Sequence, residues 1–227
     1  MTHQPQLEGV LPAPLSGVRP VGPAVPGGVP DAQCRGARRL TAGDWDRWYE
    51  RGGGWPRVVS DAEAERFCRF VGPVPGGSAV DLGCGTGHWA RQLAAWGMSV
   101  RGYDWAGEAI RQATCRSTGT TTQFQTLDLD RQPVPGIRPG SVDLVTCRFA
   151  IAYLDWARLV ADVGRRLAWN GTFFVLTRID EPGALVHDHH RGVDRQQLDQ
   201  LADGWAQHHV HRIGSRVSAL VLRRYTG

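Results

Sequence analysis

Residues 80–90 read Val-Asp-Leu-Gly-Cys-Gly-Thr-Gly-His-Trp-Ala, an apolar segment that leads into three alternating glycines and then into a helical pattern. The spacing predicts a short buried strand over 78–82 and a helix that begins at about His88. Glycine tolerates positive φ and lets the backbone approach a ligand closely. The unpaired N–H groups at the start of the helix would face that ligand. These residues therefore predict a strand–turn–helix unit that binds a small molecule.

Two interpretations of this loop differ in the cofactor that they imply. Residues 85–90 fit the G-x-G-x-x-G/A pattern of dinucleotide-binding folds. The longer pattern, Asp81 followed by Gly83, Gly85 and Gly87, resembles motif I of the class I S-adenosylmethionine-dependent methyltransferases. The resemblance implies that this stretch holds the amino-acid part of S-adenosylmethionine. Cys84 belongs to the same cofactor-binding stretch, as a small packing residue and not as a nucleophile.

An acid also ends the next predicted strand, 99–104. Asp104 lies seventeen positions beyond Gly87, close to the offset of about 20 residues at which nucleotide-binding units carry a ribose-binding carboxylate. A carboxylate accepts two hydrogen bonds at once and so can hold both vicinal ribose hydroxyls. Trp105, the next residue, presents either a stacking face for adenine or a side chain at the edge of the core. Both interpretations stay open for this tryptophan.

The third predicted strand, 122–128, again ends in an acid. The resemblance implies that Asp128 accepts a hydrogen bond from the adenine amino group, and that Leu129 adds apolar contact and a backbone N–H. Asp130 is an alternative to Asp128, because the run Asp-Leu-Asp leaves the register ambiguous by two residues.

The segment 142–155 resembles the fourth strand of the same family and the loop that follows it. Such a loop delivers residues to the methionine end of the cofactor and to the methyl acceptor. This resemblance makes Arg148 a cofactor-binding candidate and Tyr153 a catalytic one. Many small members carry a histidine pair or His-Tyr here, whereas this chain has Ala152-Tyr153. Any catalytic base must therefore come from elsewhere.

Residues 41–58 predict a short amphipathic helix followed by a glycine-rich segment. Trp45, Trp48 and Tyr49 share one face of this helix because they lie at i, i+3 and i+4. The aromatic stripe either packs the helix on the core, which we favour for Trp45, or forms a lid over the cofactor. Glycines 52–54 provide a hinge for such a lid. Tyr49 and Trp48 are then expected to line the site, with Tyr49 facing the acceptor.

Histidines gather in the last third of the chain. His187, Asp188, His189 and His190 are expected on the loop after the fifth strand, at the carboxyl edge of the sheet. His187 or His189, oriented by Asp188, is the candidate base that takes a proton from the acceptor; solvent-exposed loop histidines are the alternative. The pattern does not indicate a metal site, because no cysteine or carboxylate stands at ligand spacing.

The resemblance implies an α/β fold: a seven-stranded, mostly parallel, doubly wound sheet with a C-terminal antiparallel hairpin. The hairpin is expected over 206–212 and 216–224, and it favours a methyltransferase over a dehydrogenase. Further helices are expected over 61–71, opened by a capping box from Ser60 to Glu63, and over 155–168, ended by Asn-Gly. Residues 41–227 would form the methyltransferase domain. Residues 1–40, which hold seven of the fourteen prolines, would form a flexible or loosely wrapped tail.

Composition limits the kinds of binding partner and the cellular compartment that we expect. The net charge is only +4, and the basic residues, all arginine, are dispersed along the chain, which argues against a nucleic-acid partner. No apolar run is long enough to span a membrane, and no signal peptide is evident. Five cysteines without a C-x-x-C pair indicate reduced thiols and a cytoplasmic location. A homodimer is compatible with the sequence.

The expected activity is transfer of a methyl group from S-adenosylmethionine to an O, N or S atom of a small molecule. A specialised metabolite, as in antibiotic biosynthesis, is the expected acceptor. A protein or RNA acceptor, or a non-methylating enzyme of the same fold, is the alternative within the enzyme class. From other classes, an NAD-dependent oxidoreductase and a non-catalytic S-adenosylmethionine-binding protein stay open.

Overall fold

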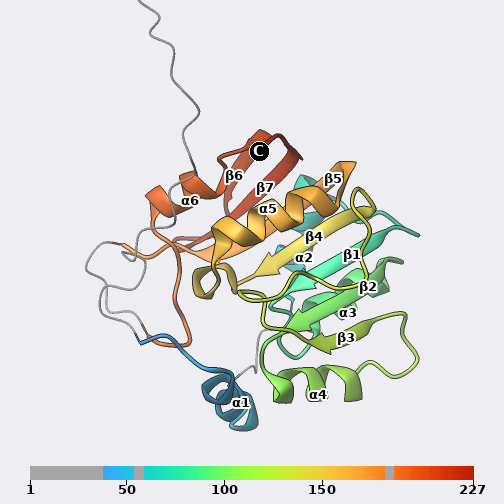
Figure 1. Cartoon of the computed structure of the whole chain (residues 1–227), viewed down its shortest axis with the longest axis vertical. Helices are drawn as coiled ribbons and strands as arrows, with labels where there is room; N and C mark the ends of the chain where they lie inside the picture. Colours follow the sequence, from blue (N-terminus) through green and yellow to red (C-terminus); the bar gives the residue numbers. More distant parts are fainter. Residues whose placement is uncertain (1–37, 54–58, 182–186) are drawn as a thin grey trace, which may run out of the picture. The chain divides into compact units, whose positions relative to one another are not determined.

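The computed structural model describes residues 38–53, 59–181 and 187–227. Within these ranges seven strands form one sheet, in the order β3-β2-β1-β4-β5-β7-β6 (Figure 1). The strands are β1 (Ser78–Leu82), β2 (Ser99–Asp104), β3 (Gln123–Thr126), β4 (Val142–Arg148), β5 (Leu167–Arg178), β6 (Trp205–Arg212) and β7 (Val217–Tyr225). β1 to β5 pair in parallel, and β7 runs antiparallel to both β5 and β6. The predicted fold class, with its terminal hairpin, is confirmed.

Helices cover both faces of the sheet. They are α1 (Ala42–Glu50), α2 (Asp61–Phe70), α3 (His88–Ala95), α4 (Gly107–Cys115), α5 (Trp156–Arg166) and α6 (Arg195–Leu201), with a 3₁₀ turn, η2 (Ile151–Tyr153). α5 passes over one face, and α2 and α3 lie behind the sheet in the same view (Figure 1). Neighbouring strand residues point to opposite faces, so Phe173 joins the α5 core and Phe174 the core of α2 and α3.

The parallel register brings the ends of four strands to one edge. Leu82 of β1 pairs with Tyr103 of β2 and with Cys147 of β4, and Asp104 pairs with Thr126 of β3. The loops that follow these strands therefore leave the sheet side by side. This edge is the one at which the sequence predicts cofactor binding.

The predicted end of the fifth helix is wrong. Asn170 and Gly171 were expected to cap a helix over 155–168, but α5 ends at Arg166 and both residues lie inside β5. The pairing of β4 with β5 shifts register between Val142 and Leu144. A Cβ on Gly171 would lie 2.7 Å from the carbonyl oxygen of Val142, so close backbone approach explains the glycine.

The predicted capping box of α2 is half correct. The Ser60 side chain accepts a hydrogen bond from the backbone N–H of Glu63, at 3.2 Å. The Glu63 carboxylate does not return to the cap; it forms two hydrogen bonds with Arg148 at the end of β4, at 2.5 and 2.8 Å. Phe67 of this helix is buried in the core, whereas Cys68, the next residue, is exposed. A tertiary ion pair has replaced the expected local hydrogen bond.

The first described residues, Arg38 to Leu40, belong to the segment predicted as a tail and contact the domain. Leu40 is buried, and Arg39 pairs with Asp130 at 2.5 Å. The rest of the predicted tail, and residues 54–58 of the predicted lid segment, lie outside the described residues. Among the helices that the structure describes, none combines the length and apolarity needed to span a membrane.

Replacing Glu63 by alanine should destabilise the protein by about 2–4 kcal/mol. The change removes a carboxylate from a guanidinium whose side chain is only 10% exposed. Thermal and denaturant unfolding measure the loss, and Glu65→Ala, an exposed acid on the same helix, is the control. Equal stability of the two variants would show that the pair contributes nothing.

Candidate cofactor site and the residues around it

The glycine loop connects β1 to α3 in the predicted conformation. Gly83, Gly85 and Gly87 all have positive φ, at 66°, 53° and 76°. All three positions also lack space: a Cβ on Gly83 would lie 2.3 Å from the Cβ of Ala150, one on Gly85 would lie 2.9 Å from the Tyr49 hydroxyl, and one on Gly87 would lie 2.6 Å from the Phe124 ring. Conformation and close packing therefore both require glycine here.

Asp104 joins the second strand to this loop. One carboxylate oxygen accepts a hydrogen bond from the Gly85 N–H at 2.8 Å, and the other accepts one from the Ala106 N–H at 2.9 Å. Burial raises the pKa of Asp104, and the two backbone N–H groups only partly oppose this shift. A carboxylate offers about four lone-pair positions, so each oxygen can still accept one ribose hydroxyl.

Asp81 is almost fully buried, with 1% of the residue exposed. Its Oδ1 accepts a hydrogen bond from the Thr146 hydroxyl at 2.8 Å, and its Oδ2 has no hydrogen-bond partner among the described residues. Burial raises the pKa of Asp81 to about 7, against the opposing effects of Thr146 and of the Arg148 charge. A buried carboxylate oxygen without a partner fits a ligand that carries a cation or an N–H donor.

Two further residues of the predicted cofactor site differ in burial. Cys84 is buried, and burial raises the pKa of its thiol well above the ordinary value. The neutral thiol packs close to Gly102, whose ideal Cβ would lie 3.0 Å from the sulfur, in keeping with a packing role. Trp105 is only partly buried, directly after Asp104.

The hydrogen bonds distinguish the two acids that follow β3, Asp128 and Asp130. Asp130 accepts hydrogen bonds from Arg39 and from the backbone N–H of Asp155, at 2.5 and 2.7 Å, so both of its oxygens hold the fold. Among the described residues, the Asp128 carboxylate accepts a hydrogen bond only from the Asp130 N–H, at 3.1 Å, and it lies 3.5 Å from the Arg131 guanidinium. Leu129 is buried in the α5 core. The geometry favours Asp128 over Asp130 as a ligand-binding acid.

Arg148 does not lie free for a cofactor. Its guanidinium is engaged by Glu63, and it lies 5.1 Å from the ring centre of Phe149. Phe149 has a positive φ of 58°, which is rare for a bulky residue, and its N–H donates to the Leu176 carbonyl at 2.6 Å. Arg148 acts on the site through charge, because it lowers the pKa of Asp81.

The aromatic face of α1 meets the predicted acceptor residues. Trp45 forms edge-to-face contacts with Tyr153 and His189, with ring centres 4.9 and 5.0 Å apart. Trp48 stacks parallel on His189 at 5.3 Å. Tyr49 completes this aromatic cluster, 6.3 Å from Trp45. Trp45, expected to pack on the core, instead packs on the two loops that carry Tyr153 and His189.

The histidine loop is organised differently from the prediction. His187 is exposed, whereas His189 is partly buried and burial lowers its pKa. Trp48 stacks on the His189 ring and Trp45 contacts it edge-to-face, and the His189 Nε2 has no hydrogen-bond partner among the described residues. Asp188, the expected orienting acid, faces Arg191 at 3.3 Å. The Arg191 backbone N–H in turn donates to the Tyr153 hydroxyl at 2.9 Å.

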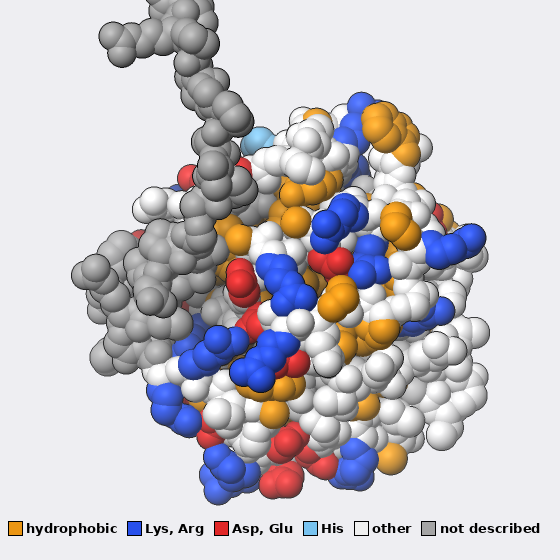
Figure 2. Space-filling model, in the orientation of Figure 1, with side chains coloured by type: hydrophobic (Ala, Val, Ile, Leu, Met, Phe, Trp, Pro, Cys, Tyr) orange, Lys and Arg blue, Asp and Glu red, His pale blue; other side chains and the backbone are white. Residues whose placement is uncertain are grey.

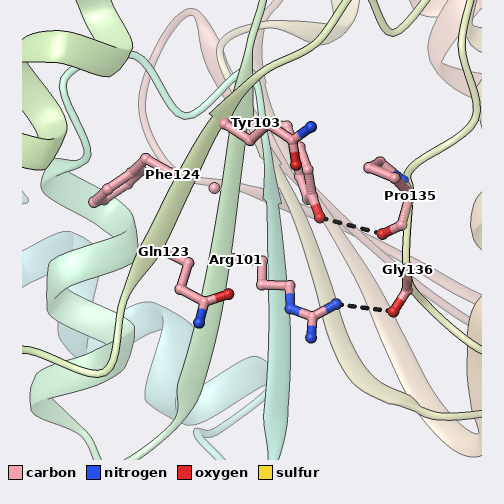
Figure 3. A pocket seen from close by; sticks show the side chains of 8 residues that line it. Arg101, Tyr103, Gln123, Phe124, Pro135 and Gly136 are labelled. Carbon is pink, nitrogen blue, oxygen red and sulfur yellow. Dashed lines mark hydrogen bonds between the residues drawn. The ribbon is translucent and has the colours of Figure 1, made fainter.

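A separate pocket of about 260 Å³ lies over β2 and β3, away from the glycine loop (Figure 3). Arg101 and Tyr103 point across it and donate hydrogen bonds to the carbonyls of Gly136 and Pro135, at 2.9 and 3.5 Å. Phe124 points to the other side of the strands (Figure 3). The pocket walls are thus tied to one another, and they hold the connection between β3 and β4.

Three further histidines, His208, His209 and His211, lie on the edge strand β6. His209 and His211 share one face, with ring centres 6.3 Å apart, and His211 stacks on Phe70 at 3.7 Å. Across the part of the chain that the structure describes, no group of three or more His, Cys, Asp or Glu side chains could hold a metal ion.

Three contributors to this site escaped the sequence analysis. Thr146 binds Asp81, Glu63 binds Arg148, and Asp46 of α1 accepts a hydrogen bond from the Glu108 N–H in the first turn of α4, at 2.9 Å. Each acts across 62 or more residues of sequence, so no local pattern marks it.

Replacing Asp81 by asparagine should flatten the dependence of stability on pH. The pKa of this group rises from 3.8 in the unfolded chain to about 7 in the folded protein. Its contribution to stability is therefore complete below about pH 4 and is lost as the pH rises through about 7, by up to about 4 kcal/mol. Chemical unfolding across this range should show a smaller loss in Asp81→Asn than in wild type. The exposed Asp203→Asn should keep the wild-type slope, and an unchanged slope in Asp81→Asn would contradict the assignment.

Comparison with known proteins finds a matching family model, similar sequences and similar solved structures. Residues 79–171 match a family model described as a methyltransferase domain. A ubiquinone biosynthesis O-methyltransferase from Albidiferax ferrireducens is 36% identical over 116 residues, which are 50% of this chain and 46% of that protein. Its counterpart from Methylococcus capsulatus is 31% identical over 115 residues, 49% of this chain and 48% of the relative. The chain thus spans about half the length of the curated relatives that it matches.

Solved structures share the fold over about three quarters of this chain. An S-adenosylmethionine-dependent methyltransferase from Mesorhizobium loti superposes with a TM-score of 0.57 at 22% identity, over 73% of this chain and 99% of that one. A phosphoethanolamine N-methyltransferase from Haemonchus contortus, solved with S-adenosylmethionine, superposes with a TM-score of 0.60 at 20% identity. The superposed region is 75% of this chain and 43% of that one. Residues 79–171 are therefore similar to a methyltransferase domain, and the chain has the fold of the class I S-adenosylmethionine-dependent methyltransferases.

Proposed function

We propose that this chain transfers a methyl group from S-adenosylmethionine to an oxygen atom of a small-molecule acceptor. The observation that carries the proposal is the hydrogen bond between Asp104 and the Gly85 N–H, at 2.8 Å. It joins the glycine loop to a carboxylate with spare acceptor positions at the edge where the strands end. The methyltransferase match over residues 79–171 supports the same conclusion.

The residues at this edge fit the proposed cofactor. Asp104 can accept hydrogen bonds from the ribose, and Asp128 can accept one from the adenine amino group, beside the backbone of Leu129. The unpartnered Oδ2 of Asp81 suits the ammonium group of the amino-acid part. Glycines 83, 85 and 87 leave the loop backbone open to close approach. When bound, S-adenosylmethionine supplies a methyl group that is already electrophilic because it is attached to a sulfonium.

Positioning and proton removal are then the tasks of the protein. Tyr49, Tyr153 and His189, brought together by Trp45, would hold the acceptor and exclude water. Burial lowers the pKa of His189, so its imidazole is neutral at pH 7 and able to accept the proton of an acceptor hydroxyl. His187 is the weaker candidate base, because it is exposed.

The names of the relatives and the surface charge both help to choose among possible methyl acceptors. Those with 36% and 31% identity carry the name O-methyltransferase, which favours oxygen over nitrogen or sulfur. On the face shown in Figure 2, arginine side chains alternate with acidic ones and do not form a continuous basic stripe. A small specialised metabolite therefore remains our proposal for the acceptor, ahead of RNA or protein, with the cytoplasm as the proposed compartment.

Two experiments test the class of function. Calorimetry with S-adenosylmethionine, S-adenosylhomocysteine and NAD should show binding of the first two ligands only; binding of NAD alone would overturn the proposal. Incubation with methyl-labelled S-adenosylmethionine and a host extract should label a small molecule. Tight binding without any labelled product would instead indicate a non-catalytic binding protein.

Asp104→Ala should weaken binding of S-adenosylmethionine by about 2–4 kcal/mol, because two charge-assisted hydrogen bonds to the ribose are lost. Calorimetry measures the change, and Asp199→Ala, an exposed acid on α6, is the matched control. Near-normal affinity in the Asp104 variant would contradict the ribose assignment.

His189→Ala should slow labelling in the extract assay by about 100-fold or more and leave the affinity for S-adenosylmethionine unchanged. The imidazole would act on the acceptor proton and not on the cofactor. His208→Ala, an exposed histidine on β6, controls for a general effect of losing histidine. Unchanged labelling by the His189 variant would remove this loop from the mechanism.

A further inference from the structure

The first turn of α4 is capped by two carboxylates from two other elements. Ala106, at the N-cap, has no side chain that could bind the free N–H groups of the helix. The Asp104 carboxylate of β2 accepts from the Ala106 N–H, and the Asp46 carboxylate of α1 accepts from the Glu108 N–H, both at 2.9 Å. Since the N-terminus of a helix carries partial positive charge, two acids there are favoured.

A second contact joins the same pair of helices. The Gln112 side-chain amide of α4 donates to the backbone carbonyl of Tyr49 at 3.2 Å and to the Glu108 carboxylate at 2.8 Å. α1 is thus attached to α4 at Asp46 and, one turn later, at Tyr49. The two helices lie side by side at the end of the sheet formed by β3 (Figure 1).

These contacts determine where the Tyr49 side chain lies. Asp46 precedes Tyr49 by three residues, so the two lie on adjacent positions of one helix surface. The Tyr49 hydroxyl reaches the glycine loop, where it lies 2.9 Å from the position that a Cβ on Gly85 would take. The Gly85 N–H is itself bound by Asp104. A closed path of contacts therefore runs from Asp104 through α4 and Asp46 to Tyr49, and back to Gly85.

The placement of Asp46 also has an electrostatic cost. Its negative charge is near enough to Asp104 to disfavour ionisation of that buried acid. A neutral cap would fill the same hydrogen-bonding position without this repulsion. The cost is consistent with a function that depends on α1 lying against α4, beyond the stability that one helix cap supplies.

We propose that Asp46 is a positioning residue that holds α1 on α4 and thereby places Tyr49 over the cofactor loop. The inference rests on the proposed function, because the loop in question is the one assigned to S-adenosylmethionine. Asp46 touches neither cofactor nor acceptor. It acts through the first turn of α4, which is also the turn that Asp104 caps.

Three variants of the full chain separate this role from a general loss of stability. Asp46→Ala removes the cap, whereas Asp46→Asn keeps a side-chain carbonyl that can accept from the Glu108 N–H. Glu50→Ala, an exposed acid at the end of α1, is the matched control. Hydrogen exchange of α1 and calorimetry with S-adenosylhomocysteine are measured on each, and circular dichroism checks that each variant is folded.

In Asp46→Ala, α1 should exchange at least about 5-fold faster, and S-adenosylhomocysteine should bind about 3- to 10-fold more weakly. Asp46→Asn and Glu50→Ala should both behave as wild type. Wild-type exchange and affinity in Asp46→Ala would overturn the inference, and so would an asparagine variant as impaired as the alanine one. Failure of the wild-type chain to bind S-adenosylhomocysteine would overturn the proposed function first, and this inference with it.

Discussion

The hydrogen bond from the Gly85 N–H to Asp104 is the contact on which the site depends. It fixes the bend of the glycine loop against the end of the neighbouring strand, and it does so with a buried carboxylate whose second oxygen caps α4. One side chain therefore sets the relative positions of the loop, β2 and α4. Burial raises the pKa of this acid, and the two backbone N–H groups act in the opposite direction because they favour the charged form.

Negative charge is concentrated at this edge of the sheet. Asp81, Asp104 and Asp46 come from β1, β2 and α1. Burial raises the pKa of Asp81 and of Asp104, and like charge adds to this, from Asp104 on Asp81 and from Asp46 on Asp104. Arg148 offsets part of that cost for Asp81 while Glu63 holds its guanidinium. An arrangement of this kind suits a ligand that brings positive charge, as the proposed cofactor does with its ammonium and sulfonium groups.

The aromatic cluster shows how a short helix reaches several loops. Trp45 and Trp48 contact residues from the loop after β4 and from the loop after β5, and Tyr49 lies over the loop after β1. α1 thus touches three of the loops that leave the carboxyl edge. Attachment of α1 to α4 controls all three contacts together, which is why a single cap on α4 has consequences for the proposed acceptor side.

The sequence by itself determined the strands, the positive-φ glycines and the acids at strand ends, because each depends on local chain geometry and on period-two burial. It also predicted the antiparallel hairpin that identifies the sheet. The partners of these residues were decided only in the tertiary structure. Glu63 left its capping box for Arg148, Asn-Gly entered β5 instead of ending α5, and Asp46 capped a helix that begins about sixty residues later. In each case a buried charge or a free N–H group pairs with the group that the fold brings nearest. The energy of such a contact depends on distance in space and not on separation along the sequence.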